Sequence, residues 1–248
     1  MKNIYRTIAM CLLAAAISVS GLSCKKKEPA APPLTPEQKA RTEMIKKGAE
    51  EAKKVFAAQV NGVEISMYEL IREMNKIAPK YVKEGEQSTP KITEKIRKEA
   101  LDNVIFNELA VQEAIRQGIS VSPERINQVV ELMKEQTGSK EAYQEYLDGL
   151  GITEDVLRKR IERSHLLELV TAKEVYQKIT IDERAARAEY QKNKNDYRDK
   201  SGQKLSYDEV SMMIKKKMVS EIGVEKKKEW GAALRKNAKI VIAKDAGK

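Results

Sequence analysis

The segment 101–153 constrains the fold more than any other, because it predicts a series of helices with clear ends. Apolar residues between positions 96 and 115 cover a broad side of the first helix, which indicates burial on more than one flank. Gly118 follows the last of them, where glycine readily adopts the left-handed conformation that ends a helix. Ser122 and Pro123 then form an N-cap and a first helical residue, and Gly138 ends the second helix. A helical core is therefore expected.

The composition agrees with a helical protein and argues against a nucleic-acid partner. Charged residues make up 34% of the chain and aromatic residues only 5%, which suits helices with solvated faces around a modest core. The net charge of +10 favours anionic partners, lipid headgroups included. The lysines, however, are spread along the predicted helices instead of being clustered with aromatic residues, so no binding of DNA or RNA is expected.

The N-terminal part of the chain predicts export and a lipid anchor. Residues 1–23 have a basic start and an apolar run at 8–19, which is shorter than the roughly 20 residues of a membrane span and fits a signal peptide. The following GLSC resembles the cleavage site of a bacterial lipoprotein, in which Cys24 is acylated, although Gly21 stands where a branched aliphatic residue is usual. An ordinary secretory signal is the alternative. Lys25, in place of an aspartate after the cysteine, favours the outer membrane.

The rest of the chain predicts one folded domain behind a tether. Residues 24–36 are rich in proline and lysine and predict an extended tether, and 37–55 predict a polar spacer helix. Within the predicted domain, 56–244, Asn61 and Gly62 are typical of a two-residue hairpin turn. The sequence KIVIA at 239–243 predicts a third strand, because a hairpin alone is only marginally stable. The expected fold is mainly α, with a small antiparallel sheet formed by the hairpin and the C-terminal strand.

The run LDNVIFNELAVQEAIRQGISVSPERINQ at 101–128 resembles the N-terminal chaperone domain of the SurA family of periplasmic foldases. The resemblance rests on Leu109, Glu113, Ala114, Gly118, Ile119, Val121 and Ser122. A weaker likeness extends over 57–197 and 205–243. The resemblance implies a multi-helix bundle on the periplasmic side of the cell envelope.

Many members of that family also contain a parvulin-type prolyl isomerase domain, which has no counterpart in this sequence. The domain is usually inserted after a helix with an ending like YQKN at 190–193, but here only a short loop separates Tyr197 from Leu205. His165 is the only histidine of the chain. Catalysis of peptide-bond rotation must lower a barrier of ~18–20 kcal/mol, which requires a preorganised pocket. The GxSxG, HExxH, CxxC and phosphate-loop motifs are missing too, so no catalytic residue, metal ligand or cofactor is predicted.

The resemblance implies an ATP-independent chaperone that binds unfolded or nascent envelope proteins in an apolar groove. Methionine suits such a groove, because its unbranched thioether adapts to varied shapes. The candidate lining residues are Met133, Tyr143, Tyr146, Leu147, Met212, Met213 and Met218. The simpler interpretation is that most of them belong to the core. Two other functions stay open, namely a structural or assembly lipoprotein that binds one specific folded partner, and a prolyl isomerase.

The missing isomerase domain leads to a first prediction. The purified protein should leave the cis–trans isomerisation of a proline-containing test peptide at its uncatalysed rate, because the sequence supplies no residues for a catalytic pocket. A parvulin-type isomerase assayed in parallel serves as the positive control. A rate clearly above background would bring isomerase activity back into consideration.

Overall fold

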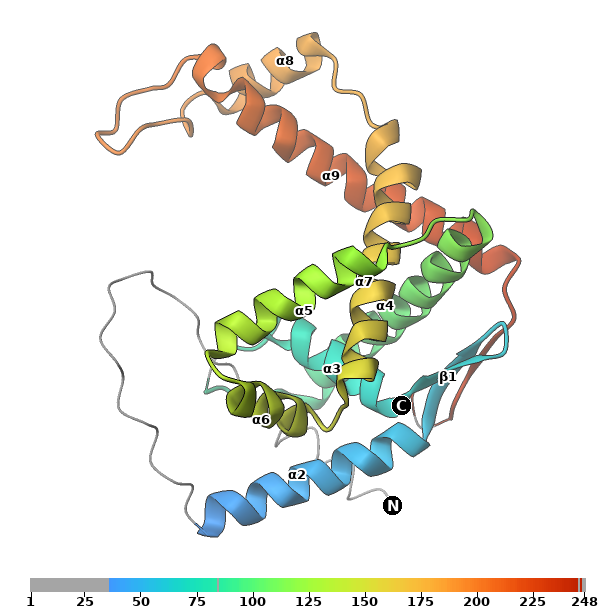
Figure 1. Ribbon diagram of the computed structural model, residues 1–248. Helices are drawn as coiled ribbons and strands as arrows, with labels where there is room; N and C mark the ends of the chain where they lie inside the picture. The colour runs from blue at the N-terminus through green and yellow to red at the C-terminus, as the bar shows by residue number, and fades with distance from the viewer. Residues whose placement is uncertain (1–35, 84, 245, 247–248) are drawn as a thin grey trace. The chain divides into compact units, whose positions relative to one another are not determined.

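The computed structural model describes residues 36–83, 85–244 and 246 of the chain. Within these residues it contains eight α-helices, two short 3-10 helices and three strands (Figure 1). The fold is mainly α with a small antiparallel sheet, as the sequence predicts. The predicted signal peptide and Cys24 lie outside the described residues.

Most helices begin where the sequence places a capping residue. Side-chain oxygens of Ser66, Ser139 and Asp182 each accept a hydrogen bond from a backbone N–H in the first turn of the helix that follows. The elements are α2 (Pro36–Lys54), β1 (Phe56–Val60), β2 (Val63–Ser66), α3 (Met67–Ile77), η2 (Ala78–Lys80), α4 (Pro90–Arg116), α5 (Pro123–Thr137), α6 (Lys140–Leu150), α7 (Glu154–Glu174), η3 (Tyr176–Lys178), α8 (Glu183–Asn193), α9 (Tyr207–Lys236) and β3 (Ile240–Ile242).

The chain forms two compact units, and each is described by itself. Unit 1 contains the described residues of Met1–Ile105, Gln128–Arg158 and Lys239–Lys248, and unit 2 contains Phe106–Asn127 and Lys159–Ala238. The sheet and the helices α2, α3 and α6 therefore belong to unit 1. Helices α8 and α9 belong to unit 2.

The sheet of unit 1 joins the two ends of the described chain. Asn61 and Gly62 have positive φ angles of 52° and 87° and turn β1 into β2, as expected for this residue pair. Strand β3 pairs antiparallel with the other edge of β1, with Ala58 opposite Ile242, so that the strand order is β2-β1-β3 (Figure 1). The N–H of Asn61 donates to the Lys239 carbonyl at 2.8 Å. The predicted pairing of the hairpin with 239–243 is thus confirmed.

Unit 1 buries its apolar side chains next to this sheet. Helix α3 begins with a reciprocal capping box, in which Ser66 accepts from the N–H of Glu69 and the Glu69 carboxylate accepts from the N–H of Ser66. The cap orients α3 so that its residue Leu70 is 1% exposed. Val60 of β1 and Val130 of α5 are fully buried. Burial of each such side chain contributes about 1.5–3 kcal/mol relative to exposure.

Unit 2 contains a first apolar cluster that brings residues of α4, α7 and α9 together. Its buried members are Phe106, Ala110, Val111, Ala114, Leu166 and Val170. The Phe106 ring meets the Trp230 ring edge-on, with centroids 5.4 Å apart. A Cβ atom added to Gly231 would lie 2.9 Å from Cδ2 of Phe106, which is closer than two carbon atoms can pack. Helix α9 therefore needs glycine at this position.

We predict that Gly231→Ala lowers the stability of unit 2. Alanine usually stabilises a helix interior by about 0.5–1 kcal/mol relative to glycine, but overpacking against the buried Phe106 ring should cost about 1–3 kcal/mol. Urea unfolding followed by circular dichroism should show a lower midpoint. The matched control is Gly149→Ala in α6, where no atom lies within 4 Å of the added carbon and the midpoint should not fall.

A second background tests the cause of the Gly231→Ala effect. In the Phe106→Leu variant the ring that blocks the added methyl group is absent. In the Phe106→Leu background, Gly231→Ala should lower the urea midpoint clearly less than in the wild-type background. An equal cost in both backgrounds would show that the Phe106 contact is not responsible.

Candidate functional site

The predicted lining residues of α5 and α6 lie in unit 1, and two of the four are interior residues. Tyr143 and Leu147 are 4% and 2% exposed, because the apolar side of α6 faces the interior. Met133 is half-buried. Tyr146 alone among the four is exposed, at 40%. In this group a binding partner would therefore meet mainly the Tyr146 side chain.

The predicted lining residues of α9 lie in unit 2, and two of the three face solvent. Met212 and Met213 are 77% and 54% exposed. Helix α9 buries positions 207, 210 and 214, and the two methionines fall beside this stripe. Met218 is half-buried and packs against a second apolar cluster. The buried members of that cluster are Ala186, Tyr207, Val210 and Ile214.

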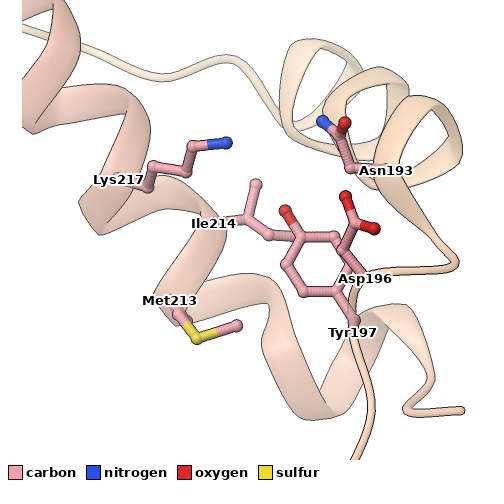
Figure 2. Close-up of a pocket in the computed structure, with 6 residues that line it drawn as sticks. All are labelled: Asn193, Asp196, Tyr197, Met213, Ile214 and Lys217. Carbon is pink, nitrogen blue, oxygen red and sulfur yellow. The ribbon is translucent and has the colours of Figure 1, made fainter.

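A pocket of about 220 Å³ opens beside Met213, and we call it the α8–α9 pocket (Figure 2). Its lining residues are Asn193, Asp196, Tyr197, Met213, Ile214 and Lys217. Asn193 ends α8, Asp196 and Tyr197 lie in the following loop, and the other three lie on one side of α9. Figure 2 shows Met213 and the Lys217 ammonium on one side of the pocket and the Asn193 and Asp196 side chains on the other. Residues from three successive segments thus converge on this pocket.

A group of tyrosines holds the loop against the two helices. The Tyr190 ring stacks on the Tyr197 ring, with centroids 5.8 Å apart and an interplanar angle of 16°. The Tyr190 hydroxyl donates to the Leu205 carbonyl at 2.8 Å, and the N–H of Leu205 donates to the Tyr197 carbonyl at 3.0 Å. These bonds close the loop into a short hairpin. One face of Tyr197 is therefore covered by Tyr190 and fixed in place.

Ion pairs fix α8 beside α9 next to the pocket. The Lys217 ammonium donates to Glu189 at 2.9 Å, and Lys215 lies 2.6 Å from Glu183. The hydrogen bond from Lys217 lowers the pKa of Glu189, and the same bond raises the pKa of Lys217. The hydrogen bond from Lys215 likewise lowers the pKa of Glu183. All four groups are thus held in their charged forms.

The Asp196 carboxylate differs from the neighbouring charges of the pocket. Among the described residues, no side chain or backbone N–H forms a hydrogen bond or ion pair with it. Lys217 lines the same pocket, but its charge is already matched by Glu189. The charge that is left without a partner at this pocket is therefore negative.

Apart from the pocket, possible metal ligands and the one histidine bear on the chemistry of the described residues. Residues 36–83, 85–244 and 246 hold no cluster of three or more His, Cys, Asp or Glu side chains that could bind a metal ion. His165 lies on α7, and its Nδ1 is 3.4 Å from the Glu168 carboxylate one helical turn away. Its side chain is half-buried, at 19% exposed. The pocket itself combines apolar side chains with an amide, an ammonium and a carboxylate group.

Five of the six pocket residues were not predicted as lining residues from the sequence, namely Asn193, Asp196, Tyr197, Ile214 and Lys217. The reason is that three of them owe their place to the stacked tyrosines, which lie seven positions apart in the sequence. A usable signal was present, because tyrosines at 190, 197 and 207 flank a polar loop between two helices. Tyrosines that bracket a short loop in this way often pack on one another.

Comparison with known proteins assigns the chain to a family. The described residues form a mainly helical fold, and the family model described as "SurA-like N-terminal domain" matches residues 41–170, more than half of the chain. The chain therefore belongs to the family of SurA-like N-terminal domains. Only the segment 194–206 joins α8 to α9, and no parvulin-type domain is present among the described residues.

One solved structure comes from work on the virulence factor PEB4 and the periplasmic protein Cj1289, two structurally related SurA-like chaperones of Campylobacter jejuni. The likeness covers 77% of this chain and 99% of that chain, with 13% sequence identity and a TM-score of 0.47. At these values the likeness supports no argument about function. None of the curated proteins matches this chain.

The ion pair between Glu189 and Lys217 gives a prediction about pH. Because the pKa of Glu189 is lower in the folded protein than its usual value of 4.5, the pair stabilises the fold above that value and stops doing so as the pH falls through the lowered pKa. At pH 7, Glu189→Gln should therefore unfold at a lower temperature than the wild type. The difference should shrink as the pH falls below 4.5.

The matched control is Glu229→Gln, which removes an exposed carboxylate of α9, the helix that carries Lys217, and this carboxylate has no ion-pair partner in the described part of the chain. Its unfolding temperature should follow that of the wild type at every pH. A Glu189→Gln difference that is constant over pH would contradict the electrostatic explanation.

Proposed function

We propose that this protein is a chaperone of the bacterial cell envelope that binds unfolded or partly folded exported proteins. One observation carries the proposal: a SurA-like chain exposes Met212 and Met213 beside an apolar pocket. Methionines are common on surfaces that accept many partners, because the flexible thioether adapts to varied shapes. The α8–α9 pocket with these two residues is the proposed site of client binding.

Binding at such a site is weak and reversible. A fully buried methionine side chain contributes about 1.5–3 kcal/mol, and each 1.4 kcal/mol changes an affinity about tenfold. A few such contacts, offset by the ordering of a flexible client, give an affinity at which clients also dissociate readily. Release then needs no ATP, which the cell envelope lacks.

The proposed location is the periplasmic side of the envelope, with a lipid anchor at Cys24. Two acyl chains suffice for stable attachment to a membrane. In the described part of the chain, no helix combines the length and the apolar character of a membrane span. The tether (24–36), the spacer helix (37–55) and the folded part (56–244) would then extend from the anchor in this order. The outer membrane is the proposed site of anchoring.

The proposal is tested by an aggregation assay with one variant and one matched control. Met213→Asp places a charge at the rim of the pocket. The concentration of this variant needed to suppress aggregation of an unfolded outer-membrane protein should be about threefold to tenfold higher than that of the wild type. This is the effect expected from the loss of one apolar contact. Met44→Asp introduces the same charge at a methionine of α2 that is 63% exposed. This control should suppress aggregation as the wild type does.

Two other outcomes would each overturn part of the proposal. If both variants suppress aggregation equally well, the α8–α9 pocket is not the client site. If the wild-type protein has no effect at several-fold excess, the chaperone function itself is wrong. Crosslinking in cells that captures one stoichiometric folded partner, instead of many unfolded clients, would favour the structural or assembly lipoprotein.

A further inference from the structure

We propose that the α8–α9 pocket selects arginine side chains of the bound polypeptide. This inference rests on the proposed function and adds a chemical preference to the same site. It follows from the size of the pocket, its apolar walls, the unpartnered Asp196 carboxylate and the Tyr197 ring at its border.

The size of the pocket points to one side chain as its occupant. Its volume of about 220 Å³ is smaller than the roughly 300–1,000 Å³ of typical small-molecule sites. Met213 and Ile214 form its apolar wall on α9, as Figure 2 shows. Long charged side chains lie with their methylene groups along such surfaces and keep the charged end in a polar setting. The wall therefore fits an aliphatic stem as well as a wholly apolar side chain.

The charge of the pocket decides between these two kinds of occupant. Asp196 has no partner among the described residues, whereas Lys217 is paired with Glu189 at 2.9 Å and has Glu221 at 3.9 Å. An acidic occupant would meet the unmatched carboxylate and be repelled. Asp196 is exposed to solvent, so an apolar occupant would gain nothing from the carboxylate, whereas a cationic one would gain an ion pair. A cationic occupant is the one that matches the site.

Geometry favours arginine over lysine. A guanidinium group presents its donors in a planar fork that matches the two oxygens of a carboxylate, whereas an ammonium group is a point charge. The same plane can stack on an aromatic ring, and Tyr197 borders the pocket with one face held by Tyr190. Figure 2 shows the Asp196 side chain next to the Tyr197 ring. One arginine can thus pair with Asp196 and contact the ring at once.

The test uses the full-length protein and a series of fluorescent ten-residue peptides that differ only at one central position. The common sequence is rich in leucine and serine, and the central residue is arginine, citrulline, lysine or norleucine. Citrulline has the shape of arginine without its charge. Fluorescence anisotropy should show that the arginine peptide binds about fivefold more tightly than the citrulline peptide, the size of effect expected for one partly exposed ion pair. The lysine peptide should lie between them.

The Asp196→Asn variant removes the charge but keeps the shape of the pocket. It should bind the arginine and citrulline peptides equally, with the affinity for the norleucine peptide unchanged within about twofold. Asp155→Asn removes an exposed carboxylate of α7 and should keep the full preference for arginine. For the wild type, the preference should also shrink as salt rises, because ions screen exposed pairs.

Failure of this inference can be told apart from failure of the chaperone proposal. If the wild type suppresses aggregation but binds the arginine and citrulline peptides equally, or if Asp196→Asn keeps the preference, the pocket does not select arginine. If the wild type neither binds any of the peptides nor suppresses aggregation, the proposed function is wrong as well.

Discussion

The backbone pairing of β1 with β3 is the contact on which the closure of this chain depends. Asn61 and Lys239 are 178 positions apart, and each donates its N–H to an oxygen of the other. Because a lone hairpin is marginal in water, β1 and β2 need a third strand. The chain supplies it only after the 30-residue helix α9 has ended. A strand of three residues therefore completes a sheet that the first two strands cannot stabilise alone.

The elements that the sequence predicts well are those that local chemistry determines. The capping boxes at Ser66 and Ser206 mark the starts of α3 and α9, and Asn61 with Gly62 marks the hairpin. Local patterns do not distinguish a buried core residue from a residue that lines a groove, since both are apolar at helical spacing. Tyr143 of α6 is buried and Met213 of α9 is exposed, yet the sequence treats them alike.

The lining of the pocket was hard to predict for a different physical reason. Asp196 and Tyr197 lie in a polar loop, where neither periodicity nor propensity fixes a side-chain position. Their places depend on the stacking of Tyr190 on Tyr197 and on the bond from the Tyr190 hydroxyl to Leu205. These contacts join an end of α8 to the start of α9 through a loop. Such contacts become visible only when both helices are placed.

The exposed methionines of α9 lie close in sequence to the two lysines that form ion pairs with α8. Lys215 and Lys217 reach across to carboxylates of α8, and Ile214 between them is buried. Met213 lies one helical turn before Lys217 and lines the pocket with it beside the end of α8, whereas Met212 is 77% exposed. The ion pairs and the buried Ile214 thus hold α9 beside α8, while the Met212 and Met213 side chains remain exposed. The methionines proposed for client binding are therefore ones that the packing of α8 against α9 leaves exposed.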